Sequence, residues 1–260
     1  MKRCSESEEI PFVKAIQKHQ EHLQKRHLIS DFAGLNQVMG NGFESGLFYL
    51  MYGSSHIINS ILLSMTVLAQ LPTKGGLNSS VIFIDSENIF NPYTLIRLAH
   101  SVKLNPNLVL SRIFVARAFI WHHVGEIVNN LKVLIEGKEA RLVLISGLTT
   151  LFEGDYKRRK NQMLLDIANK LRNIAIDNNI IIAASARLAR GEVDKPTGGK
   201  IITHMPHVLV RIVQEGERIK FKLTKHPSRP AMQTVQWLSR PARAPHTLSL
   251  DHFLKKPVER

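Results

Sequence analysis

The segment from Gly53 to Ser60, with the sequence GSSHIINS, has the length and frame of a phosphate-binding loop. In the working motif, G-x-x-x-x-G-K-[ST], the second glycine lets backbone N–H groups close around phosphates. The lysine supplies charge and the hydroxyl reaches magnesium. Here Gly53 and Ser60 match the two ends, but Ile58 replaces the second glycine and the uncharged Asn59 replaces the lysine. Because isoleucine resists the positive φ that glycine permits, the frame lacks the residues that would hold a nucleotide. An ordinary turn before a helix is the alternative interpretation.

The charge of the chain favours a polyanionic partner. Lys and Arg number 35 against 21 Asp and Glu in 260 residues, which gives a formal net charge of +14 at pH 7. This excess suits nucleic acid better than a neutral metabolite, although charge can also serve solubility alone. The lone cysteine, Cys4, excludes an intramolecular disulfide and a cysteine cluster for zinc or iron–sulfur ligation. We expect no metal and no cofactor.

Length and hydropathy predict a single substantial α/β domain that does not cross a membrane. Hydrophobic residues make up 44% of the chain, enough to fill a core. No apolar run approaches the roughly 20 residues that a bilayer requires, and the N-terminus does not match a signal peptide. We expect an intracellular protein, cytoplasmic and nucleoid-associated, or nuclear if the organism is eukaryotic.

The elements that must position the loop follow a pattern typical of a mostly parallel sheet flanked by helices. Apolar runs predict strands at 47–52, 81–85, 113–118, 142–146 and 180–185. Helices are predicted at 60–70 and 92–102, and an apolar face from Leu164 to Ala175 predicts a third. After Gly199 the pattern alternates, which predicts antiparallel strands at 209–214, 218–225 and 234–238 that extend the sheet.

Several segments then resemble, in order, the core of archaeal RadA and its eukaryotic strand-exchange relatives, the RecA/RadA-type recombinases. The sequences are GNGFESG at 40–46, QLP with GGL within 70–77, FIDSE at 83–87, ARAF at 116–119 and TLFEGDY at 150–156, followed by Gly198-Gly199 with His204 and Pro206. The resemblance runs from about Phe12 to Trp237. It implies a RecA-like core at 31–240, between an N-terminal arm at 1–30 and a flexible tail at 241–260.

The resemblance also implies that most nucleotide-site residues have changed. Ser146 occupies the position of the family's metal-binding aspartate, and Asn91 and Thr94 occupy the positions of its arginines near adenine. Arg187 occupies the position of the glutamine that senses the γ-phosphate, and Lys225 that of the aspartate that caps ATP from the adjacent subunit. Glu87 matches the water-positioning glutamate, or else caps a strand end. We therefore predict a pseudo-ATPase whose degenerate site comprises Gly53, Ile58, Asn59, Ser60, Glu87 and Ser146. The alternative is a DNA-dependent ATPase in which Arg187 and Lys225 supply charge to a rearranged site with Asn59, Ser60 and Glu87.

Basic residues remain where the family has its two DNA-binding loops. They are Arg187 and Arg190 in the first, and Lys195 and Lys200 in a shortened second loop. Lys157, Arg158, Arg159 and Lys160 form a further cluster at a helix start. Lysine and arginine there would contact phosphates, although a charge run is also typical of a solvated face. Phe119, Trp121, His122 and His123 could stack on bases, or Trp121 could pack in the core.

Two segments outside the core indicate protein partners. Phe12 and Ala15 reproduce the FxxA motif by which a recombinase docks into the next subunit, or belong to an amphipathic helix start. Residues 247–254 resemble a sliding-clamp (PCNA) interaction peptide in which Leu250, Phe253 and Leu254 would insert, or they strap back over the domain. The sequence therefore favours a non-catalytic RadA paralogue. We expect it to bind DNA, preferably single-stranded, and to modulate homologous recombination and DNA repair through recombinase or clamp contacts. A pure protein–protein adaptor is the alternative.

Overall fold

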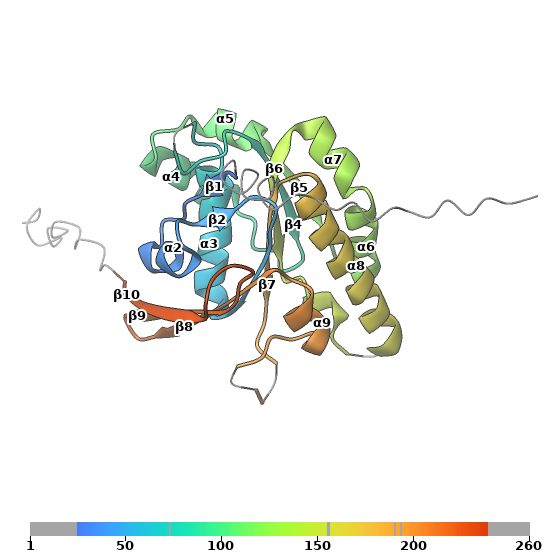
Figure 1. Cartoon of the computed structure of the whole chain (residues 1–260). Helices are drawn as coiled ribbons and strands as arrows, with labels where there is room; N and C mark the ends of the chain where they lie inside the picture. The colour runs from blue at the N-terminus through green and yellow to red at the C-terminus, as the bar shows by residue number, and fades with distance from the viewer. Residues whose placement is uncertain (1–24, 73, 155–156, 190, 193, 239–260) are drawn as a thin grey trace, which may run out of the picture.

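An eight-stranded sheet forms the centre of the molecule in a computed structural model of the chain (Figure 1). The structure describes residues 25–238 except 73, 155, 156, 190 and 193. The strand order is β10-β9-β8-β3-β7-β6-β4-β5. The strands are β3 (Phe48–Gly53), β4 (Ser80–Asp85), β5 (Ile113–Arg117), β6 (Ala140–Ser146), β7 (Ile181–Ala186), β8 (Val208–Glu215), β9 (Arg218–Lys225) and β10 (Met232–Trp237). Pairs from β5 through to β8 are parallel, and β8-β9 and β9-β10 are antiparallel, which confirms the predicted RecA-like α/β class.

Helices cover both faces of this sheet (Figure 1). One face carries α2 (Ala33–Met39) and α3 (Ser55–Leu68), with α4 (Pro92–Ser101) and α5 (Pro106–Ser111) packed on α3. The other carries α6 (Trp121–Asn129), α7 (Leu131–Lys138), α8 (Lys157–Asp177) and α9 (Gly199–His204). A 3₁₀ turn, η1 (Thr150–Phe152), precedes α8, and β1 (His27–Leu28) pairs with β2 (Phe43–Glu44). None of the helices in the described part of the chain is long and apolar enough to cross a bilayer.

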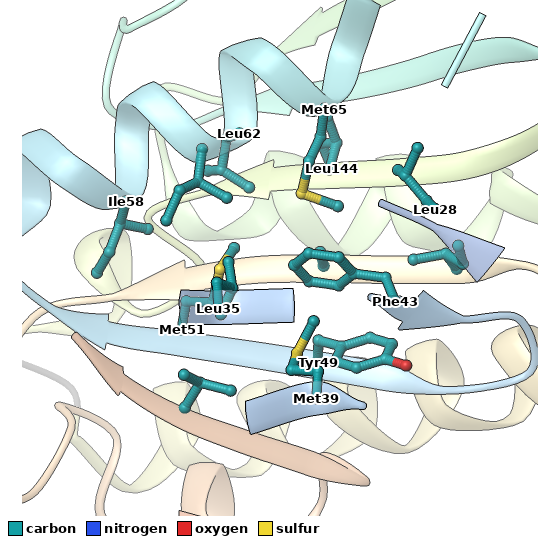
Figure 2. Packing of buried hydrophobic residues seen from close by; sticks show 14 of the residues in the cluster. Leu28, Leu35, Met39, Phe43, Tyr49, Met51, Ile58, Leu62, Met65 and Leu144 are labelled. Carbon is teal, nitrogen blue, oxygen red and sulfur yellow. The ribbon is translucent and has the colours of Figure 1, made fainter. Parts of the chain in front are cut away.

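The two faces of β3 belong to different cores, because successive side chains of a strand point in opposite directions. Tyr49 and Met51 pack toward α3, whereas Phe48, Leu50 and Tyr52 pack toward the α8 side. A parallel strand that is covered on both faces has a continuous apolar sequence, and residues 48–52, FYLMY, are such a run. Figure 2 shows Ile58 and Leu62 of α3 directed at the layer that holds Met51.

The predicted strands agree with the structure to within two residues at either end, but the first predicted helix does not. Helix α3 begins at Ser55 rather than at residue 60. Ser54 has extended backbone angles, and its carbonyl accepts the N–H groups of both Ile57 and Ile58 at 3.1 Å. The segment with the phosphate-loop frame is thus mostly the first turns of a helix. Strand β8 was predicted to be antiparallel; it is antiparallel to β9 on one side but parallel to β3 on the other.

Candidate nucleotide and nucleic-acid site

The predicted site residues meet at one edge of the sheet because parallel strands place their carboxyl ends together. Gly53, Asp85, Ser146 and Ala186 end β3, β4, β6 and β7. Arg187 follows β7 directly, and Glu87 lies two residues after the end of β4. This edge is where the family resemblance places the nucleotide.

The Gly53 segment is closed against β8. Gly53 has a φ of 125°, and a Cβ atom there would lie 2.0 Å from the carbonyl oxygen of Ile212. The N–H of Ser54 donates to that oxygen at 2.8 Å, and the Ser54 hydroxyl accepts from the N–H of Gln214 at 2.9 Å. Glycine is therefore required at 53 by the close approach of β8, whatever binds there.

The next three motif residues, Ile58, Asn59 and Ser60, all lie in α3. Ile58 is 1% exposed and belongs to the cluster in Figure 2. The Ser60 hydroxyl donates to the carbonyl of His56 at 3.1 Å. Asn59 is partly buried, and its Oδ1 has no hydrogen-bond partner among the residues described. The segment thus lacks the cation of the working motif, and its Ile58 and Ser60 side chains already have partners within the chain.

Ser146 organises the turn after β4 together with Asp85. Its hydroxyl donates to Asp85 Oδ1 at 2.7 Å and accepts from the N–H of Ser86 at 3.1 Å. The Asp85 carboxylate also accepts from the N–H groups of Ile89 at 3.1 Å and Phe90 at 2.9 Å. Both side chains are buried, so these bonds fix the backbone that carries Glu87.

Glu87 is paired within the chain. Its Oε1 accepts from Arg187 Nε at 2.9 Å and from the Thr150 hydroxyl at 2.9 Å. The glutamate side chain is 9% exposed and the arginine side chain 53%. Gly147 packs against it so closely that a Cβ there would lie 2.4 Å from Glu87 Cγ. Arg187 thus neutralises the charge of the mostly buried Glu87 carboxylate.

Lys225 is bound by backbone carbonyls at the end of α9. Its Nζ donates to the carbonyl oxygens of His204 at 2.6 Å and Pro206 at 2.7 Å. Burial is the main cause that lowers the pKa of Lys225, and the positive charge of the nearby Arg172 lowers it further. A cation is favourable at a helix C-terminus. In the rearranged-site alternative, Arg187 and Lys225 would both have to leave existing partners.

The basic segment after β7 forms a short closed hairpin. Leu188 pairs with Pro196, and the N–H of Thr197 donates to the carbonyl of Arg187 at 2.8 Å. Lys195 has a side chain that is 66% exposed and that pairs with Glu192 at 3.0 Å. Lys200 is exposed on α9, while Arg190 lies outside the described residues.

The second basic cluster opens α8. Arg158 is exposed, Lys160 donates to the carbonyl of Glu153 at 2.6 Å, and Arg159 lies 6.0 Å from the Trp121 ring centroid. The side chain of Lys157 is not among those described. Trp121 packs against the core, whereas Phe119 is 71% exposed. Of Phe119 and Trp121, it is therefore Phe119 that presents most of its ring to solvent. The partner residues Phe12, Ala15, Leu250, Phe253 and Leu254 lie outside the described ranges.

The structure also contains a basic sheet surface that was not predicted from the sequence. Arg218, Lys220 and Lys222 alternate along β9 on the side opposite the buried Phe221, which packs with Phe32. Trp237 on β10 is 57% exposed, and the Arg218 guanidinium lies 4.4 Å from its ring centroid. The signal was present as R-x-K-x-K within RIKFKLTK. We name this surface the β9 basic face.

The hairpin adjoins the β9 basic face. Asp194 of the hairpin pairs with Arg211 of β8, and its carbonyl accepts from the Tyr52 hydroxyl at 3.2 Å. Arg211, Lys220 and Lys222 line one shallow hollow of about 200 Å³. Basic side chains thus lie on β8 and β9 beside the hairpin, and Glu215, which pairs with Lys220, lines the same hollow. The described residues contain no group of three acidic, histidine or cysteine side chains that could hold a metal ion.

Two comparisons with known proteins agree with this architecture. The family model described as Rad51 matches residues 27–240, which include every strand of the large sheet. The DNA repair and recombination protein RadA of Aeropyrum pernix is 25% identical over 229 residues, which cover 83% of this chain and 72% of that protein.

Proposed function

The chain belongs to the Rad51 family, and from this premise we propose that it is a non-catalytic member that binds single-stranded DNA independently of ATP. We propose homologous recombination and DNA repair as its setting, since the RadA relative carries those processes in its name. The observation that supports its lack of catalysis is the Glu87–Arg187 pair, at 2.9 Å, because the resemblance assigns these positions to the water-positioning glutamate and the γ-phosphate-sensing glutamine.

The rest of the nucleotide site supports the same conclusion. Ile58 fills core space, the Ser60 hydroxyl is bonded to its own helix, and Ser146 holds Asp85. A bound nucleotide would have to compete with each of these contacts. It would gain no lysine and no metal-binding carboxylate at Ser146 in return.

DNA binding is supported by basic side chains on the hairpin, on α9 and on the β9 basic face. Lys200 and Lys222 have no ion-pair partner among the residues described, and Trp237 offers an exposed aromatic face. Single-stranded DNA is bound by such combinations of cationic grooves and stacking platforms. The closed hairpin favours contact with the sugar–phosphate backbone over insertion between bases along the strand.

Partners follow from the terminal segments. We propose that Phe12 and Ala15 contact a recombinase subunit, and that Leu250, Phe253 and Leu254 contact a sliding clamp of the PCNA type. These contacts would let a protein without ATPase activity modulate an assembly that has it.

The test is a titration of fluorescent single-stranded DNA followed by anisotropy at two salt concentrations, with and without magnesium and ATP. We expect tight, salt-sensitive binding that ignores ATP. Lys200→Ala combined with Lys222→Ala should weaken binding and reduce the salt slope by up to about two units. Lys132→Ala, which removes an exposed charge from α7, is the matched control.

Two results would overturn the proposal. Binding that requires ATP, or ATP turnover that Glu87→Gln abolishes, would establish the atypical ATPase instead. Undetectable DNA binding with intact partner binding through Phe12 or Phe253 would establish the adaptor.

A further inference from the structure

A polar groove of about 670 Å³ lies at the amino-terminal edge of the large sheet, opposite the edge that carries Gly53 and Ser146. Its lining includes the residues that begin or directly precede β4, β6 and β7, and Arg112, which directly precedes β5. These strands lie side by side in the order β7-β6-β4-β5, and neighbouring strands are about 4.8 Å apart, so the lining extends over roughly 14 Å. We name this surface the amino-edge groove.

Three arginines, Arg26, Arg112 and Arg141, line the amino-edge groove. None of their guanidinium groups has an ion-pair partner among the residues that the structure describes. Arg112 Nη1 lies 3.4 Å from Asn78 Oδ1, which is longer than an ordinary N–H···O bond. The backbone of Arg26 is held in place, because its N–H donates to the Ser45 hydroxyl at 3.2 Å and its carbonyl accepts from the Ser45 N–H at 2.9 Å. The groove therefore holds guanidinium donors that are available to a ligand.

The rest of the polar lining leaves the amino-edge groove with a surplus of positive charge. The carboxylates of Glu136 and Glu139 line it too, so three cations lie beside two anions. The neutral polar residues are Asn78, Ser79, Ser80, Asn178 and Asn179. Amide and hydroxyl groups donate hydrogen bonds and guanidinium groups bind carboxylates, so this lining fits an acidic peptide.

The densest acidic run of the sequence lies in the segment that leads to Arg26. Glu6, Glu8 and Glu9 fall within residues 5–9, SESEE, and no other four consecutive residues of the sequence contain three acidic side chains. An extended chain from Glu6 to Glu9 spans about 10 Å, which is within the length of the groove. Glu9 and Arg26 are separated by about 16 residues, and a flexible tether of that length gives an r.m.s. separation of roughly 20–24 Å and an effective concentration on the order of millimolar.

We propose that this acidic run binds in the amino-edge groove of its own chain, with Glu6, Glu8 and Glu9 paired with the guanidinium groups. Exposed ion pairs are individually weak, but a tethered ligand needs an intrinsic affinity only on the order of millimolar to be bound about half of the time. The contact is independent of the proposed DNA binding.

The contact regulates the proposed partner segment. Phe12 and Ala15 lie between the acidic run and Arg26 in the chain, so binding of the run draws them to the amino-terminal edge of the sheet. This consequence rests on the proposed function, in which Phe12 and Ala15 contact a recombinase subunit. If the run is bound about half of the time and excludes the partner, the apparent affinity for that partner is about half of its intrinsic value.

The experiment uses Cys4, the lone cysteine, as the attachment point for a nitroxide spin label in the full chain. The label broadens the NMR signals of backbone amides that it approaches, and the amides of Ser79 and Asn179 report on the groove. In the triple variant Glu6→Gln, Glu8→Gln and Glu9→Gln only the tether keeps the label near the sheet. We expect the broadening at these two amides to fall about twofold or more in that variant, as release of a half-populated contact requires.

A matched pair of variants locates the contact on the domain. Arg112→Gln combined with Arg141→Gln should produce the same fall. Arg117→Gln removes an exposed arginine from the carboxyl end of β5, which does not line the groove, and should leave the broadening unchanged. Combining Arg112→Glu and Arg141→Glu with Glu6→Lys, Glu8→Lys and Glu9→Lys should restore it, because both sides of the contact then have opposite charge to the native ones.

Each result decides one part of the proposal. Equal broadening in the native chain and the triple glutamine variant would refute the contact, because the tether alone would explain it. A fall in Arg117→Gln as large as in the groove variant would refute the groove as the site, because loss of any positive charge would then be sufficient.

Titration of the unlabelled protein with purified RadA recombinase tests the regulation. Release of the acidic run in the triple glutamine variant should tighten binding through Phe12 about twofold or more. Equal affinity of the native chain and the variant would overturn the regulation. If neither binds RadA, the proposed partner is refuted, whereas the amide broadening still decides whether the acidic run occupies the groove.

Discussion

Restoring the phosphate-loop residues should damage the fold rather than create a nucleotide site. Ile58 is 1% exposed and lies in the core between α3 and the sheet (Figure 2). Truncating a buried isoleucine to alanine costs about 2–5 kcal/mol, and glycine in a helix interior costs about 1 kcal/mol more. We expect the double variant Ile58→Gly with Asn59→Lys to lose about 3–6 kcal/mol of unfolding free energy, a large share of the stability of an ordinary domain.

Urea denaturation followed by circular dichroism measures this loss, and a fluorescent ATP analogue reports binding. Ile58→Val keeps most of the side chain and should cost only about 0.5–1.5 kcal/mol. Asn59→Lys alone separates the effect of charge from that of the cavity. A double variant as stable as the native protein that also binds magnesium–ATP would refute the reasoning, because the first turns of α3 would then be able to open into a loop.

Three further predictions concern single polar side chains, one at the site and two elsewhere in the domain. Arg187→Gln should cost about 1–3 kcal/mol, because the mostly buried Glu87 loses its cation; a double-mutant cycle with Glu87→Gln measures the coupling, and zero coupling would contradict the pair. Burial, and then Arg172, lower the pKa of His207 to about 4, below the usual 6.5. The folded state then binds fewer protons than the unfolded one, so stability should be full above pH 6.5 and fall by roughly 1–2 kcal/mol toward pH 4, after allowance for a half-exposed ring. His207→Gln should flatten that dependence in urea titrations. Lys225→Met should cost about 1–2 kcal/mol by leaving the carbonyls at the end of α9 without their donor, and an unchanged urea midpoint would argue against this role.

The strands could be predicted because their signal is local. The runs around Tyr49 and Val81 are apolar, and the second is also rich in β-branched residues; burial on both faces requires such apolar runs. The start of α3 was misplaced because the phosphate-loop frame suggested a loop, although Ser54 is a favourable N-cap residue type.

The bonds that decide the chemistry of the site could not be predicted in the same way. Glu87 and Arg187 lie 100 residues apart in the chain, and they meet only because β4 and β7, which flank β6, end at the same edge of the sheet. The acceptors of Lys225 are backbone carbonyls, and because every residue has one, the sequence does not indicate which of them Lys225 contacts. The β9 basic face, by contrast, was visible as an alternation of Arg218, Lys220 and Lys222 once β9 was recognised.

The substitutions at the nucleotide site compensate one another. Arg187 supplies the positive charge that the mostly buried Glu87 carboxylate requires, and Ser146 supplies a hydroxyl donor to the buried Asp85. Reverting Ser146 to aspartate would set two carboxylates side by side at a distance where the present oxygens are 2.7 Å apart, and without a metal they would repel. Reverting Arg187 to glutamine would leave Glu87 without its cation. Each of these single substitutions should therefore cost stability, which supports the proposal that the present side chains stabilise the fold at this edge of the sheet.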